Sequence, residues 1–112
     1  MVVSPAKLNF GTVSVGTTSA SQPATITNEF NDDEVDFFAT FIMANYTKTS
    51  STCGATLGPQ QSCQITFACQ PKTTGPLIGA YAFLYSSVEV SGIMDGDDYR
   101  KIGVVQFTCT GI

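Results

Sequence analysis

The sequence contains no histidine and no tryptophan, which limits the chemistry the chain can perform. Histidine is the usual base beside a catalytic cysteine and a common zinc ligand, and the chain has no Cys-x-x-Cys motif either. Carboxylate pairs could serve a glycosidase, but here they lie in acidic loops without an aromatic sugar platform. We therefore expect a protein that is not an enzyme and that has no cofactor or metal.

Positive charge is scarce. The net charge is −4, and the five basic residues form no stripe or patch: Lys7, Lys48, Lys72, Arg100 and Lys101. A protein that binds nucleic acid must neutralise phosphates with clustered cations. Nucleic acid is therefore not an expected partner.

Long apolar runs are also missing. The longest, from 37 to 44, is far shorter than the roughly 20 residues of a membrane-spanning helix, so we expect no membrane insertion. The N-terminus has neither the basic region nor the apolar stretch of a signal peptide. Two origins fit this pattern: a small protein made in the cytoplasm, or a segment cut from a longer exported protein.

What the chain does contain is typical of β-structure. Threonine, serine, valine and glycine are abundant, and eight phenylalanines and four tyrosines supply large core side chains. A length of 112 residues predicts one domain, 1–112.

Short alternating segments separated by turn signals predict seven strands, at about 6–15, 22–30, 35–44, 46–49, 62–70, 79–89 and 101–110. This pattern indicates an all-β fold, a seven-stranded immunoglobulin-like β-sandwich with antiparallel Greek-key topology. A jelly roll is the alternative, and it would need an eighth strand. In the first segment, Pro5 starts the strand, and Gly11 and Gly16 allow a kink and a turn, which predicts an edge strand that bends and crosses over.

Several motifs follow one another in an order that resembles a known family. They are the 4–19 segment, Ile26-Thr27-Asn28, the 53–63 segment with Gly58-Pro59, Ile65-Thr66-Phe67 followed by Pro71 and Gly75, and the closing Cys109-Thr110-Gly111. Together they resemble ASH-type immunoglobulin-like domains, which are relatives of hydin, the major sperm protein and the bacterial choice-of-anchor repeats. The resemblance implies a non-catalytic binding or structural module.

Three positions depart from the family pattern. Gln60 stands where glycine is usual, Cys69 where a core phenylalanine is common, and Cys109 where the closing motif has its first glycine. These departures do not threaten the fold, but they put in doubt any particular partner of a family member.

The four cysteines suggest two disulfides. Cys53 and Cys63 look like the pair that flanks a proline-containing turn in the bacterial form of the family. Cys69 and Cys109 have inward-facing parity near the ends of two strands on opposite sheets, so a bridge across the core is feasible. Free core thiols are the alternative, and a cytoplasmic origin favours them.

Seven carboxylates are predicted to crowd one end of the sandwich. Asp32, Asp33, Glu34 and Asp36 belong to one loop region, and Asp95, Asp97 and Asp98 belong to another. Like charges so close together suit a basic protein surface, a calcium ion at the second group, or plain solvation by water.

Strand 35–44 carries phenylalanines of both parities, so one set should be core. The other set, with Phe38 and Ile42 among it, forms an exposed apolar face or is covered by a loop. The strands at 6–15 and 101–110 are predicted sheet edges, which offers docking by strand addition as a second mode.

These features together predict a protein-binding structural module. Our preferred setting is a phage capsid decoration protein on the virion surface, docked on coat subunits and able to form a homo-oligomer. The alternative is a module of an exported bacterial cell-surface protein. A ciliary or centrosomal scaffold module is a more distant third.

Overall fold

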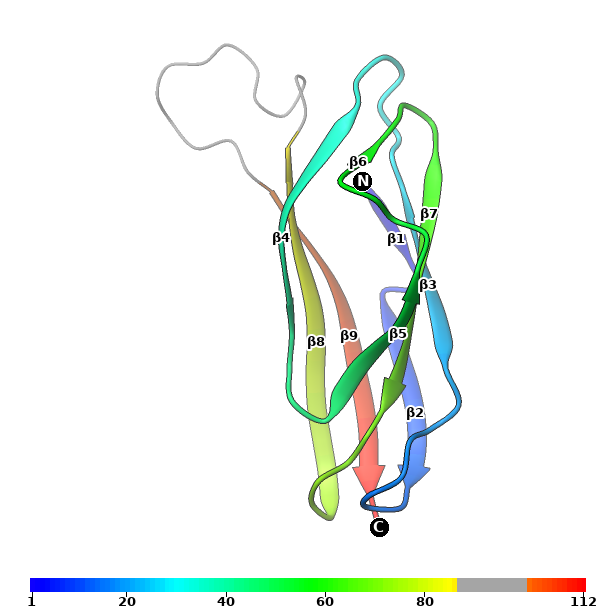
Figure 1. Cartoon of the computed structure of the whole chain (residues 1–112), viewed down its shortest axis with the longest axis vertical. Helices are drawn as coiled ribbons and strands as arrows, with labels where there is room; N and C mark the ends of the chain where they lie inside the picture. The colour runs from blue at the N-terminus through cyan, green and yellow to red at the C-terminus, as the bar shows by residue number, and fades with distance from the viewer. Residues whose placement is uncertain (87–100) are drawn as a thin grey trace.

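The computed structural model describes residues 1–86 and 101–112, which form nine β-strands in two packed sheets (Figure 1). The strands are β1 (Val2–Ser4), β2 (Lys7–Val13), β3 (Gln22–Thr27), β4 (Val35–Ile42), β5 (Tyr46–Ser51), β6 (Thr56–Leu57), β7 (Ser62–Cys69), β8 (Gly75–Ser86) and β9 (Lys101–Gly111).

One sheet has four strands in the order β1-β3-β7-β5, and the other has five in the order β2-β9-β8-β4-β6. This is the strand arrangement of an immunoglobulin-like sandwich, so the predicted fold class is confirmed and the jelly roll is not the architecture. Two details differ from the prediction. The described residues form nine strands instead of the seven predicted, and β2 pairs with β9 in parallel rather than antiparallel.

The two additional strands, β1 and β6, lie outside the seven predicted segments. β1 precedes the predicted strand at 6–15 and joins one sheet, whereas β2 lies within that predicted strand and joins the other. The predicted kink at Gly11 is real, because this residue has a φ of 70° and the β2–β9 register shifts between Asn9 and Thr12. The second addition, β6, is only two residues long and pairs with Val35 and Asp36.

Aromatic side chains fill the space between the sheets. The ring of Phe67 lies 4.9 Å from that of Phe107 and 5.0 Å from that of Tyr81, centroid to centroid. Tyr46 of β5 packs 4.7 Å from Phe107 of β9, and its hydroxyl donates a hydrogen bond to the backbone oxygen of Leu77 in β8. Rings from both sheets therefore interlock in one core.

Two further predictions need correction. The strand at 101–110 is not a sheet edge, because β9 lies between β2 and β8. The predicted turn at 71–76 ends earlier, since β8 already begins at Gly75 and pairs along β9. The last predicted residues of the 79–89 strand, and the loop after it, lie outside the described residues.

Candidate functional site

The acidic loop after β3 is fastened by one buried side chain. Asn28 is fully buried, and its amide nitrogen donates hydrogen bonds to the backbone oxygens of Asp33, Leu57 and Gly58 at 2.9 to 3.0 Å. Its side-chain oxygen accepts a hydrogen bond from the backbone N–H of Phe30 at 2.9 Å. Asn28 therefore connects the loop between β3 and β4 to β6 of the five-stranded sheet.

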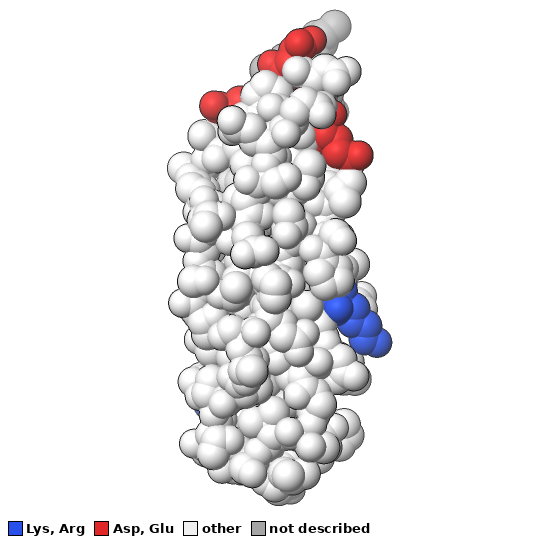
Figure 2. Space-filling view, turned by 90° about the vertical axis from the view of Figure 1, so that its right-hand side faces the viewer, with Lys and Arg blue, Asp and Glu red and all other residues white. Residues whose placement is uncertain are grey.

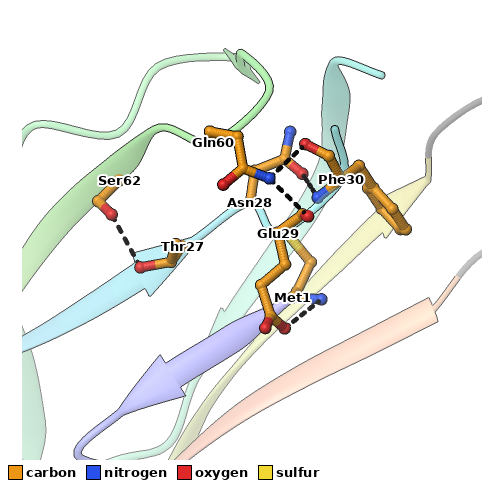
Figure 3. Close-up of polar contacts among 7 residues, drawn as sticks. All are labelled: Met1, Thr27, Asn28, Glu29, Phe30, Gln60 and Ser62. Atoms are coloured by element: carbon orange, nitrogen blue, oxygen red, sulfur yellow. Dashed lines mark hydrogen bonds and ion pairs between the residues drawn. The ribbon is translucent and has the colours of Figure 1, made fainter. Parts of the chain in front are cut away.

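Gln60 fastens the same loop from outside, as Figure 3 shows. Its amide nitrogen donates to the backbone oxygens of Glu29 at 2.8 Å and Phe30 at 3.1 Å, and to the side-chain oxygen of Asn31 at 3.2 Å. Gln60 has a φ of 61°, a left-handed conformation that favours glycine. The geometry explains why glycine is usual at this position and what glutamine adds there.

Asp32, Asp33 and Glu34 of the first predicted acidic group lie in the loop between β3 and β4, and Asp36 lies beside that loop in β4. Asp32, Glu34 and Asp36 are exposed, and Asp33 is half-buried. On the face seen in Figure 2, the red carboxylates gather near one end, and the blue cations lie away from that end. The other predicted group, Asp95, Asp97 and Asp98, lies outside the described residues. Within residues 1–86 and 101–112, no group of three or more potential ligands could hold a metal ion.

The four cysteines form two disulfides, Cys53–Cys63 and Cys69–Cys109. The first has a Cα–Cα distance of 5.0 Å and joins the segment after β5 to the neighbouring strand β7. The second has a Cα–Cα distance of 6.5 Å and joins β7 to β9, so it links the two sheets through the core. No cysteine in the chain is left as a free thiol.

The outer face of the five-stranded sheet is apolar. Strand pairing places two rows of outward side chains across β4, β8 and β9: Phe41, Ala82 and Val104 in one row, and Ala39, Leu84 and Ile102 in the other. Phe41 is 61% exposed and Ile102 is 64% exposed, although both residues are large and hydrophobic. We call this surface, together with Met43 and Ile78, the apolar face.

The sequence pattern did not locate this surface. Phe38 and Ile42 are exposed, at 51% and 41%, as one of the two interpretations predicted. Ile42 nevertheless lies opposite Tyr81, so it has the parity of the inner face and does not belong to the apolar face. Ile78 of β8, at 80% exposed, and Ile102 of β9 were not singled out. Outward positions on three neighbouring strands can be recognised as one surface only when the register between the strands is known.

The outer face of the four-stranded sheet has different chemistry. The hydroxyl of Thr66 is 2.7 Å from that of Thr49 and 2.6 Å from that of Ser50, across β7 and β5. Thr27 and Ser62 form a further hydroxyl pair at 2.8 Å, between β3 and β7. Neighbouring side chains on this face therefore satisfy one another while remaining accessible to water.

Three tyrosines on the inner side of the sandwich have raised pKa values. Burial raises the pKa of Tyr46, Tyr81 and Tyr85 above the ordinary value of 10.0, and a hydrogen bond with Thr40 partly offsets this for Tyr81. These groups stay neutral at physiological pH, so none of them is a charged group of a site.

Comparison with known proteins identifies the fold. No family model matches the sequence, and no curated protein matches it. A solved human ASH / PapD-like domain, domain 7 of CEP192, superposes with a TM-score of 0.69 at 10% identity, covering 99% of this chain and 84% of that one. The chain has the ASH-type immunoglobulin-like fold.

Two other solved structures resemble this chain in fold. SSP-19 from Caenorhabditis elegans, an MSP-domain protein like family member, matches with a TM-score of 0.62 at 11% identity over 98% of this chain and 99% of that one. The VesB protease of Vibrio cholerae matches with a TM-score of 0.68 at 17% identity over 93% of this chain. The chain spans only 30% of the length of VesB. At these identities, the likeness concerns the fold alone.

Among residues 1–86 and 101–112, no helix is long and apolar enough to cross a membrane.

Proposed function

We propose that this chain is a non-catalytic module that binds another protein through its apolar face. The observation that carries the proposal is the exposure of Phe41, Ile78 and Ile102 on one side of a single sheet. Contiguous apolar patches on soluble domains commonly mark interaction sites, and large side chains are the usual anchors of such interfaces. ASH-type and MSP-type domains are often protein-interaction modules, which agrees with this use of the surface.

The chemistry of the chain supports a binding role over a catalytic one. The sequence has no histidine, and all four cysteines are held in disulfides, so neither a histidine base nor a thiol nucleophile is available. The described carboxylates lie on or beside one exposed loop rather than in a cavity. A part of a longer enzyme could still have this fold without contributing to its chemistry.

For the biological setting, we propose a decoration protein on a virion surface, where the apolar face docks on coat subunits. The principal alternative is a module of an exported protein, and a scaffold module of the ciliary type is the third setting. The two disulfides favour the exported module, because a cytoplasmic origin favours free thiols. They are compatible with the virion setting as well, because virion surfaces are oxidising environments. Genomic neighbours would separate the two, since coat and portal genes accompany one and secretion genes the other.

Co-sedimentation with candidate capsids tests the proposal. We expect the wild-type chain to co-sediment and the double variant Phe41→Thr, Ile102→Thr to bind at least about tenfold more weakly. Thr66→Val, on the opposite outer face, is the matched control and should bind like the wild type. If the double variant binds equally well, the apolar face is not the docking surface. If the wild-type chain self-associates, and the double variant loses self-association but still binds capsids, the apolar face is the interface of a homo-oligomer.

A further inference from the structure

A cavity of about 140 Å³ opens at one side of the sandwich, between β4 and β5. Its inner wall consists of core side chains from both sheets: Ile26, Ile65, Tyr81 and Phe83. Phe37 forms part of the wall near β4 and is only half-buried. The core is therefore open to solvent at this point, and the lining can accept an apolar group.

The rim of the cavity is polar and carries one positive charge. Thr40 of β4 and Ser51 of β5 line it with hydroxyl groups, and Lys48 lies beside them. A register shift in β5 sets Lys48 opposite Phe67 and Ser51 opposite Ile65, so both have the parity of the inner face. Lys48 is exposed and forms no ion pair with any described residue.

The same side of the molecule presents an open strand edge. On the side of β4 away from β8, β6 pairs only with Val35 and Asp36, and the N–H of Phe37 donates to the oxygen of Ala55 at 2.9 Å. Beyond that point, the described part of the chain supplies no strand to pair with 39–42 on this side.

Ladder geometry indicates which backbone groups face the open edge. The N–H of Met43 donates to the oxygen of Ala80 in β8 at 3.2 Å. In an antiparallel pair, backbone groups point alternately toward and away from the partner strand. Those of Thr40 and Ile42 therefore point away from β8, toward the open edge.

The chain itself shows how a strand can occupy this edge. Leu57 of β6 lies opposite Val35 and points into the sandwich, where only 6% of it is exposed. A strand that continued the line of β6 along β4 would place a side chain opposite Thr40 with the same inward direction. Thr40 lines the cavity, so that side chain would enter it.

We propose that the open edge of β4 and this cavity together form an acceptor site for an extended segment of a partner protein. The segment pairs with Thr40 and Ile42, inserts one leucine- to phenylalanine-sized side chain, and sets an acidic residue beside Lys48. Apolar cavities of about 150 Å³ bind a benzene-sized group, so one side chain fits where a larger ligand would not. Backbone pairing supplies affinity, and the cavity supplies specificity.

This inference rests on the proposed function as a protein-binding module, but it uses a different surface from the apolar face. The probe is a blocked pentapeptide of valine, threonine, phenylalanine, threonine and aspartate, titrated into the full chain and followed by NMR. We expect shifts at Ile65 and protection of the Thr40 and Ile42 amides from hydrogen exchange. A peptide with alanine at its centre should bind at least about tenfold more weakly.

Two variants test the two halves of the site. Ile42→Pro removes a backbone N–H that points toward the open edge of β4. Proline is tolerated at a sheet edge, and the variant should weaken peptide binding about tenfold. Gly54→Leu fills the rim, where an added Cβ meets nothing within 4 Å, and should do the same. Folding of each variant is checked by its NMR spectrum. Thr66→Val is the matched control, because it alters only the outer face of the four-stranded sheet, and it should bind the peptide normally.

The outcomes separate this inference from the proposed function. Equal binding of the phenylalanine and alanine peptides, no binding of either, or unchanged binding by both folded variants would overturn the acceptor site. Dimerisation of the wild-type chain that Ile42→Pro abolishes would instead assign the edge to a second copy and overturn it as well. In each of these cases, loss of capsid binding in the Phe41→Thr, Ile102→Thr variant would leave the proposed function standing.

Discussion

The two outer faces of the sandwich have the same backbone pattern but different chemistry. On the four-stranded sheet, outward threonines and serines pair through their hydroxyl groups, as Thr66 does with Thr49 and Ser50. On the five-stranded sheet, the outward positions include Phe41, Ile78 and Ile102, all more than half exposed. The polar side chains of the first face form hydrogen bonds with one another and remain accessible to water. The second face leaves a large apolar area exposed.

This difference teaches that alternation alone does not reveal function. Both sheets show period-two alternation, and both bury their inner residues in one aromatic core. What distinguishes them is the type of residue that occupies the outward positions. The outward apolar side chains are not part of the core, so folding does not explain them. Such a surface indicates contact with another molecule.

The two outer faces exist only while the two sheets remain packed together. The largest loss of folding stability should therefore come from removing the disulfide that links the sheets. We expect Cys69→Ala with Cys109→Ala to lower the free energy of unfolding by about 4 kcal/mol, since this bridge closes a sequence separation of 40. Cys53→Ala with Cys63→Ala, with a separation of 10, should cost about 3 kcal/mol. Urea denaturation of both variants measures this, and a larger loss from the second pair would contradict the ranking.

A second link between the sheets is polar and should have the next largest effect. Asn28→Ala removes a buried side chain that makes four hydrogen bonds, and we expect it to cost about 3 kcal/mol. The exposed Asn31→Ala serves as the control and should cost less than about 1 kcal/mol. Equal unfolding midpoints for the two variants would show that Asn28 does not hold the sheets together.

The inner side of the sandwich can be probed by alkaline pH. Burial raises the pKa of Tyr81, Tyr46 and Tyr85 in the folded state, so the folded chain holds these protons more tightly than the unfolded chain. The contribution of these tyrosines to the free energy of unfolding should be constant below about pH 10. It should fall as the pH rises from about 10 through the folded-state pKa values. Urea denaturation from pH 9 upward measures the decline, and Tyr81→Phe should make it shallower. A decline that is equally steep in the variant would exclude Tyr81 as a contributor.

The smallest effects on stability are expected from the outer faces themselves. Ile78→Thr on the apolar face and Thr66→Val on the hydroxyl-paired face should each change the free energy of unfolding by no more than about 0.5 kcal/mol. Both positions point away from the core, so neither substitution creates a cavity. A loss above about 2 kcal/mol from Ile78→Thr would mean that the apolar face serves folding, and it would weaken the proposed binding role.

Much of the fold could be predicted because alternation and turn residues are local signals. The segments that became β3, β4, β5, β7 and β9 were all found, and Gly11 marked a real irregularity in β2. The short strands β1 and β6 were missed, since each depends on pairing with a distant strand rather than on its own residues. The parallel direction of β2 was missed for the same reason.

The candidate site was less predictable than the fold. Phe38 and Ile42 stood out because they lie in a run of phenylalanines, but the apolar face is formed by outward residues of three strands, and Ile78 and Ile102 are single residues on two of them. The roles of Asn28 and Gln60 depend on where the backbone oxygens of Leu57 and Glu29 come to lie. No local pattern encodes such a meeting of distant segments. The cavity between β4 and β5 arises from the spacing of two sheets, which a sequence does not display.

The parallel pairing of β2 with β9 has a mechanical consequence. A stretching force applied at the two chain ends would act along these strands and load their hydrogen bonds together, in shear, instead of opening them one at a time. The Cys69–Cys109 bridge would then pass tension from β9 directly to β7, so the segment between these cysteines could not extend while the bridge is intact. With this arrangement, the strands would have to slide past one another before the domain could be pulled apart along its length.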